Sequence, residues 1–177
     1  SFWRSKNIIK DLKKNKVDLY HGLSHELPVG IEKTKIKTVV TIHDLIFLRF
    51  PNLFTKIDRK IYEKKFRHAC ESSDKIVAVS NQTKKDIINF FDVEEKKIEV
   101  IYQGCNKVFK SKRKSSEITE VKNKFNLFEN YLLYVGSIEE RKNLMTLLHS
   151  LKGLKNKNLI IIGDGKNYKE KCIEYIK

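Results

Sequence analysis

The chain has 177 residues, and 37 Lys and Arg residues against 22 Asp and Glu residues give it a formal net charge of +15. A hydrophobic share of 40% supports a packed core and excludes a disordered tail. The longest aliphatic block, Leu159–Ile162, is far shorter than the ~20 residues that cross a bilayer. The three cysteines form no CxxC pair, so we expect a reducing compartment and neither a disulfide scaffold nor a zinc module.

Six short aliphatic runs are typical of strands that are buried on both faces of a parallel sheet. The predicted strands are residues 17–20, 38–42, 76–79, 98–101, 131–135 and 159–162. Apolar residues recur at helical spacing in residues 55–72, in the segment after Ser80, which is a predicted N-cap, and in residues 144–151, where Asn143 is the predicted N-cap and Gly153 the predicted C′ residue. This alternation predicts an α/β fold of the doubly wound type.

A basic stretch, residues 107–116, contains few aliphatic residues and lies between two blocks of predicted strands. We interpret it as a surface linker that joins a first unit, residues 1–106, to a second unit, residues 117–177. The second unit would contain only two strands, fewer than a complete sheet usually has. We therefore expect it to be the first part of a larger domain.

Ligands of open α/β sheets bind beyond the carboxyl ends of the strands. Polar, small or titratable residues follow every predicted strand of this chain. These strand exits are His21-Gly22, His43-Asp44, Ser80-Asn81, Gln103-Gly104, Gly136-Ser137 and Gly163-Asp164-Gly165. Helix caps and turns account for some of these residue types, but two histidines at such positions favour a binding site.

The exit after residues 131–135 is a candidate phosphate site. Gly136 lets the chain turn close to a ligand, and Arg141 and Lys142 precede a predicted helix N-terminus, where backbone N–H groups favour an anion. A guanidinium and an ammonium group there would hold a diphosphate. The alternative is a solvated basic pair that neutralises Glu139 and Glu140.

His43 and Asp44 are candidates for contact with a substrate. His43 could bond a hydroxyl or transfer a proton, with Asp44 fixing its orientation. The alternative is a structural histidine held by loop carbonyls.

Other phosphate and metal motifs are absent from the sequence. The GDGK run at residues 163–166 is neither a P-loop nor GxGxxG, because Ile160 and Tyr168 stand where glycines are required. The sequence has no DxD pair for a divalent cation, so we predict no metal site and a metal-independent phosphate site.

Four segments, taken together and in order, resemble the family 4 ("group 1") retaining glycosyltransferases of GT-B fold. They are TIHDLIFLRFP (residues 41–51), SDKIVAVS (residues 73–80) with Thr83, VIYQG (residues 100–104) and YVGSIEERKNL (residues 134–144). The resemblance implies parts of two Rossmann-like domains with parallel sheets. The N-terminal one would be on the acceptor side, and the C-terminal one would bind the donor nucleotide.

The resemblance also implies roles for individual residues. Arg141 and Lys142 would hold the donor diphosphate and stabilise the leaving nucleotide, in a pocket that Gly136 lines. His43 would contact the donor sugar near the reacting carbon, with Asp44 beside it.

Three further residues are candidates for the border of the cleft. His21 is placed there by the resemblance, and Ser80 and Gly163 by their positions at strand exits.

The implied reaction moves a sugar, with retention and without a cofactor, from a UDP- or GDP-linked donor to a glycan or lipid-linked acceptor. We expect the enzyme to be cytoplasmic, with its basic surface in peripheral contact with the anionic inner membrane face. The alternative is a basic nucleic-acid-binding α/β module, although aromatic residues do not interleave with the basic runs. A dehydrogenase is disfavoured because GxGxxG is missing.

The chain departs from the family pattern in three respects. The only pair with the spacing of the family's Glu-x7-Glu motif, Glu63 and Glu71, precedes the linker, so we treat it as coincidence. Family members are about twice as long, and Glu140 stands where proline is common. We therefore expect a middle portion of an enzyme that is inactive on its own.

Overall fold

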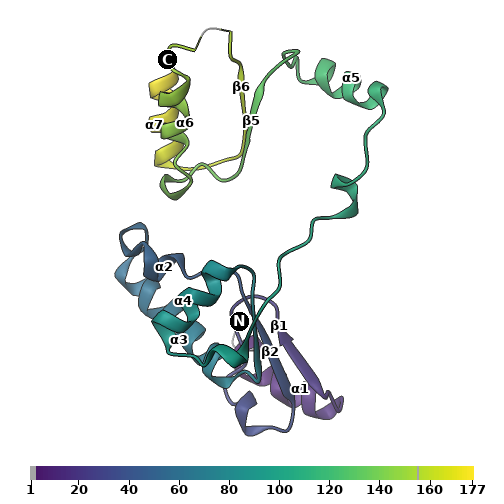
Figure 1. Cartoon of the computed structure of the whole chain (residues 1–177), viewed down its shortest axis with the longest axis vertical. Coiled ribbons are helices and arrows are strands. Elements are labelled where there is room, and N and C mark those ends of the chain that lie inside the picture. The colour runs from purple at the N-terminus through teal and green to yellow at the C-terminus, as the bar shows by residue number, and fades with distance from the viewer. Residues whose placement is uncertain (1–2, 155) are drawn as a thin grey trace. The chain divides into compact units, whose positions relative to one another are not determined.

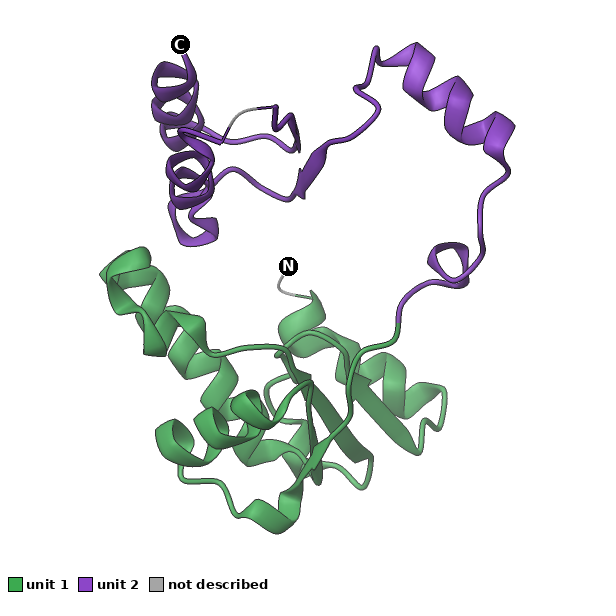
Figure 2. Cartoon of the chain, turned by 45° about the horizontal axis from the view of Figure 1, so that its top comes forward, with its two compact units in different colours: residues 1–104 green, residues 105–177 purple. Residues whose placement is uncertain are grey.

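The computed structural model describes residues 3–154 and 156–177 and divides into two compact units, residues 1–104 and residues 105–177 (Figures 1 and 2). Each unit has its own hydrophobic core. The segment 107–116 contains a 3-10 turn, Lys107–Phe109, and helix α5 (Ser115–Lys124) begins inside it. In the described ranges, no helix is both long and apolar enough to cross a membrane.

Unit 1 is built on a sheet of four parallel strands in the order β1-β2-β3-β4. The strands are β1 (Leu19–Gly22), β2 (Lys37–Ile42), β3 (Lys75–Ala78) and β4 (Ile98–Val100). Each lies within two residues of a predicted strand, and each pairs with its sequence neighbour. The parallel α/β fold expected from the sequence is confirmed.

The helices of unit 1 connect these strands. A π-helical turn, Trp3–Asn7, leads into α1 (Ile8–Lys14), and α2 (Ile46–Arg49), α3 (Lys56–Ser72) and α4 (Asn81–Phe91) follow. Helix α3 begins where Thr55 Oγ1 accepts the N–H of Asp58 at 3.1 Å. Helix α4 begins where Ser80 Oγ accepts the N–H of Thr83 at 3.0 Å, as the predicted N-cap requires.

The core of unit 1 lies on one face of the sheet. In β2, Thr38, Val40 and Ile42 are buried, whereas Val39 and Thr41 are only half-buried. The strand register places Ile76 and Ile98 on the same face as Val40. The buried strand residues of the core all lie on that face. The prediction that these strands are buried on both faces is therefore wrong for this chain. The apolar residues of the second face are half-buried or exposed.

Unit 2 is smaller. Its sheet has two parallel strands, β5 (Leu132–Val135) and β6 (Leu159–Ile162), as expected. Helices α6 (Leu144–Leu151) and α7 (Asn167–Ile176) pack on one face, where the core includes Leu144, Leu148 and Cys172. On the other face Leu133, Val135 and Ile162 are more than half exposed.

The two predicted ends of α6 have different outcomes. Gly153 has a φ of +90° just beyond the helix, as a C′ residue should. Asn143 is the N-cap residue, but its side chain accepts no backbone N–H. Its φ is +52°, and its Oδ1 lies 2.9 Å from Thr146 Oγ1 instead. The capping function expected of Asn143 is therefore not seen.

Candidate functional site

His43, at the carboxyl end of β2, has partners on both ring nitrogens. Its Nε2 lies 3.0 Å from the carbonyl oxygen of Leu23, and its Nδ1 lies 3.1 Å from Nε2 of Gln103. A carbonyl oxygen can only accept, so the proton belongs on Nε2, and Nδ1 then accepts from the Gln103 amide. The partners thus define both the tautomer and the orientation of the ring.

The backbone of His43 is held as well. Its N–H donates to Nδ1 of His25 at 3.4 Å, and its carbonyl accepts from Oγ1 of Thr83 at 3.1 Å. Thr83 lies in the first turn of α4, and its hydroxyl is 2.9 Å from that of Ser80. Groups that follow β1, β3 and β4 therefore converge on the residue that follows β2. We call Leu23, His25, His43, Thr83 and Gln103 the His43 cluster.

His25 contributes a half-buried neutral ring to this cluster. Its ring stacks on Phe66 with centroids 4.3 Å apart and meets His43 edge-on at 5.0 Å. Burial, followed by the charge of His43, lowers the pKa of His25 to about 4. The ring is thus neutral near neutral pH, and because Nδ1 accepts the N–H of His43, its remaining proton belongs on Nε2. Sequence reasoning gave this residue no role.

Asp44 does not orient His43, which corrects the sequence-based expectation. Its Oδ1 accepts the N–H of Ile46 at 3.2 Å and so supports the first turn of α2. Gln103 takes the orienting position, although it lies 60 residues away in the sequence. The one sequence signal that could have identified Gln103 is its place directly after β4.

Helix α2, which follows His43, is fastened to α4. Arg49 Nη2 and Nε lie 2.6 and 3.3 Å from the two carboxylate oxygens of Asp86, which is buried. Gln82 Nε2 donates to the same carboxylate at 2.8 Å. A bidentate guanidinium–carboxylate pair is geometrically specific. It therefore limits how far the turn after His43 can shift.

His21 lies on the exposed face of the unit 1 sheet. Its Nε2 is 2.9 Å from Oγ1 of Thr41, a half-buried residue of β2 two positions beyond its register partner, Val39. His21 is not part of the His43 cluster. The structure also explains Gly22 beside it, because a Cβ at that position would collide with the carbonyl of Glu26.

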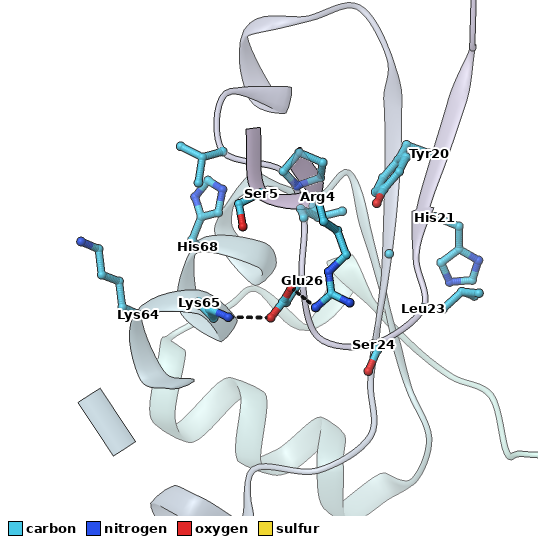
Figure 3. A pocket seen from close by; sticks show the side chains of 14 residues that line it. Arg4, Ser5, Tyr20, His21, Leu23, Ser24, Glu26, Lys64, Lys65 and His68 are labelled. Carbon is cyan, nitrogen blue, oxygen red and sulfur yellow. Dashed lines mark hydrogen bonds and ion pairs between the residues drawn. The ribbon is translucent and has the colours of Figure 1, made fainter. Parts of the chain in front are cut away.

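A cavity of about 490 Å³ opens beside the end of β1 (Figure 3). The loop after β1, the turn before α1 and the middle of α3 line it. Glu26 receives Arg4 and Lys65 there, each at 2.8 Å. Burial alone would raise the pKa of Glu26, but the hydrogen bonds from Lys65 and Arg4 outweigh it, and the pKa falls. The lining is mostly apolar, with this ion-pair network on one side.

His68 also lines the cavity. Its Nδ1 lies 3.2 Å from Oγ of Ser72, while its buried Nε2 has no hydrogen-bond partner in the described part of the chain. A buried polar atom without a partner is costly. A ligand hydroxyl in the cavity would satisfy it. Sequence reasoning gave His68 no function, and only its place in the cavity identifies it.

In unit 2, glycines allow the exits of β5 and β6 to pack together. The N–H of Gly136 donates to Ile162 at 3.0 Å, and Gly136 has a φ of +155°. A Cβ on Gly163 would collide with the carbonyl of Gly136. Gly163 therefore has a structural role in this approach.

Arg141 and Lys142 are exposed on the 3-10 turn Glu140–Lys142, immediately before α6. Arg141 Nε lies 2.7 Å from Glu139 Oε2. Hydrogen bonds from Ser137 and then from Arg141 outweigh the effect of burial and lower the pKa of Glu139. Arg141 thus forms an ion pair with Glu139 through Nε, as the alternative of a basic pair that neutralises nearby carboxylates requires.

Across residues 3–154 and 156–177, no three His, Cys, Asp or Glu side chains are grouped to hold a metal ion.

Each unit has a parallel sheet with helices, and its candidate site residues lie at the strand exits. The sequence pattern of Glycosyltransferase Family 4 matches residues 1–107, and the chain belongs to this family, as its motifs predicted. This match favours the glycosyltransferase hypothesis over the nucleic-acid and dehydrogenase alternatives.

Two curated relatives illustrate the similarity. O-antigen chain mannosyltransferase B of Escherichia coli is 29% identical over 133 residues, which are 75% of this chain and 34% of that protein. O-antigen chain mannosyltransferase RfbU of Salmonella typhimurium is 28% identical over 167 residues, or 92% of this chain and 40% of that protein. The chain thus spans less than half the length of either relative.

Solved structures support the fold. A glycosyltransferase from Rickettsia africae matches 98% of this chain and 46% of its own, with a TM-score of 0.67 and 20% identity. Anabaena Alr3699/HepE, solved in complex with UDP and glucose, matches 96% of this chain and 47% of its own, with a TM-score of 0.71 and 15% identity.

Proposed function

We propose that the protein containing this chain transfers a sugar from a nucleotide-diphosphate donor to a glycan or lipid-linked acceptor in the assembly of a surface polysaccharide. Family membership supports the reaction class. The O-antigen mannosyltransferases among its relatives favour mannose as the sugar. The observation that carries the proposal is the His43 cluster, because residues that follow β1, β3 and β4 hold the ring and the backbone of His43 at the edge where open α/β sheets bind ligands.

In the proposed reaction, the bond between the anomeric carbon and the diphosphate breaks, the acceptor oxygen bonds to that carbon with retention of configuration, and the proton of the acceptor hydroxyl passes to the departing diphosphate. Negative charge builds up on the departing diphosphate. We assign its stabilisation to Arg141 and Lys142 without a metal, since fixed cations are most effective where charge develops. The ion pair of Arg141 uses Nε, so the terminal nitrogens of its guanidinium are the groups proposed to hold the diphosphate.

His43 is proposed to contact the donor sugar. Both ring nitrogens already have partners, so the contact is one of positioning, in which a sugar hydroxyl would replace the Leu23 carbonyl at Nε2. The mostly apolar cavity beside β1 is the proposed recess for the acceptor, where His68 Nε2 would bond an acceptor hydroxyl.

Calorimetric titration of UDP, GDP and ADP into the chain tests the diphosphate assignment. We expect one nucleotide to bind saturably and Arg141→Ala to weaken its binding about tenfold or more, since hydrogen bonds between charged groups contribute about 1.5–3 kcal/mol. Lys171→Ala, which removes an exposed cation from α7, is the matched control and should bind like the unmodified chain. Equal affinity in the Arg141 and Lys171 variants would contradict the assignment.

A further inference from the structure

The first half of α3 exposes apolar side chains on the side away from the core. Ile57 is 72% exposed and Ile61 is 46% exposed. Their spacing of four residues places them one turn apart on the same side of the helix. The opposite side carries Phe66, which packs against the core, and Cys70, which is fully buried. Ile57 and Ile61 therefore contribute little to the core of unit 1.

The turn that leads into α3 also exposes apolar side chains. Phe50 is more than half exposed, and Leu53, in the 3-10 turn Pro51–Leu53, is also exposed. We call Phe50, Leu53, Ile57 and Ile61 the α3 ridge. It lies within one continuous stretch of 12 residues of unit 1, residues 50–61.

A row of lysines runs beside the ridge. Lys56, Lys60 and Lys64 are spaced four residues apart, so they lie along one side of the helix. Lys56 and Lys60 directly precede Ile57 and Ile61, so this side borders the ridge. Among the described residues, none of the three takes part in a salt bridge. Lys64 and Lys65 both line the cavity beside β1, and Figure 3 shows the ion pair of Lys65 with Glu26 there. The lysines are therefore available to an external anion.

The acidic residues of this half of α3 do not neutralise the row. Asp58 bonds Thr55 at the start of the helix, and Glu63 pairs with Arg67. An apolar ridge flanked by unpaired lysines is typical of helices that lie in the interface of an anionic bilayer. In water the apolar side chains of the ridge would stay exposed, and the lysines would repel a cationic partner.

We propose that the α3 ridge docks the protein on an anionic lipid surface. Ile57 and Ile61 enter the boundary between headgroups and acyl chains, and Lys56, Lys60 and Lys64 contact lipid phosphates. The same helix continues to the cavity beside β1, which Lys64, Lys65 and His68 line. Docking in this way would bring the cavity to the membrane surface. The inference goes beyond the proposed function, because it involves neither donor nor reaction.

Vesicle co-sedimentation of the full chain, without nucleotide, tests the proposal. We expect binding to vesicles of equal parts phosphatidylcholine and phosphatidylglycerol, no binding to phosphatidylcholine alone, and weaker binding as salt rises. The double variants Ile57→Ser with Ile61→Ser, and Lys60→Glu with Lys64→Glu, should each lower the partition coefficient about tenfold or more. Circular dichroism would show that these surface variants remain folded.

Two matched controls separate the ridge from general properties of the chain. Lys13→Glu with Lys14→Glu makes the same charge change at exposed positions of α1, and Ile118→Ser with Val121→Ser makes a similar apolar change on α5. Both controls should keep most of the binding.

Three results would overturn the proposal. An equal loss in either control would mean that net charge or general hydrophobicity drives binding. Failure to bind anionic vesicles would reject lipid as the occupant. A dimer that Ile57→Ser with Ile61→Ser disperses, without vesicle binding, would assign the ridge to a second copy. None of these results affects nucleotide binding, so this proposal and the proposed function fail separately.

Discussion

The two units differ in how completely their own residues bury the sheet and in how many contacts hold the residues that follow the strands. In unit 1, four strands share a core that includes Val40, Ile76 and Ile98, and the residues after all four strands meet at His43. In unit 2, two strands leave one face exposed, with Val135 68% and Ile162 56% accessible. A site assembled from several strand exits needs the whole sheet, whereas a site on one turn needs only that turn.

The contrast extends to the candidate residues themselves. His43 has partners for both ring nitrogens and both backbone groups. Arg141 lies exposed on a short turn with one ion pair. We therefore expect substitutions in unit 1 to alter structure and geometry together. Substitutions at the turn of unit 2 should alter ligand affinity with little effect on stability.

The largest predicted effect compares the two sheets directly. Ile76→Ala removes a fully buried side chain of unit 1 and should lower the free energy of unfolding of that unit by about 3 kcal/mol, because it leaves a cavity. Ile162→Ala, on the exposed face of unit 2, should cost less than about 1 kcal/mol. Urea denaturation followed separately in the two units would measure both. Equal costs would mean that the exposed face of unit 2 is covered in solution.

An intermediate effect should appear only in acid. The pKa of His25 is lowered from 6.5 to about 4 in the folded chain, so between these values the unfolded chain binds the extra proton more strongly. The stability contributed by His25 is therefore complete above about pH 6.5 and is lost as the pH falls toward 4.

His25→Phe keeps the stacking on Phe66 and removes the titration. Its free energy of unfolding, measured by urea denaturation from pH 7 to pH 4, should fall less steeply than that of the unmodified chain. Parallel curves would contradict the burial of a neutral His25.

The smallest predicted effect concerns which residue orients His43. Gln103→Leu removes the donor to Nδ1 and should shift the nitrogen resonance of that atom, while the Leu23 carbonyl still holds the proton on Nε2, with little change in stability. Asp44→Asn should leave the tautomer unchanged, because Asp44 bonds the backbone of Ile46. Nitrogen NMR of the imidazole would distinguish the tautomers. A change in the Asp44 variant alone would restore Asp44 as the orienting group.

Much of the fold was predictable because its signals are local. Aliphatic runs identified all six strands, and the helix over residues 55–72 and the caps at Ser80 and Gly153 follow from spacing and side-chain chemistry. Predictions of individual hydrogen bonds were less successful, because a polar side chain can choose among several partners. Asn143 and Asp44 each form a different hydrogen bond from the expected one, with Thr146 and with the backbone of Ile46.

The sequence by itself determined the α/β class, the family and the strand exits where the candidate residues lie, since period, composition and motif order are properties of neighbouring residues. Only the tertiary structure decided which exits meet. It brought Gln103, Thr83 and His25 to His43, and it placed His68 with its buried Nε2 beside the cavity. Parallel strands align their carboxyl ends through long crossovers, so residues up to 60 positions apart become neighbours for reasons that no local pattern records.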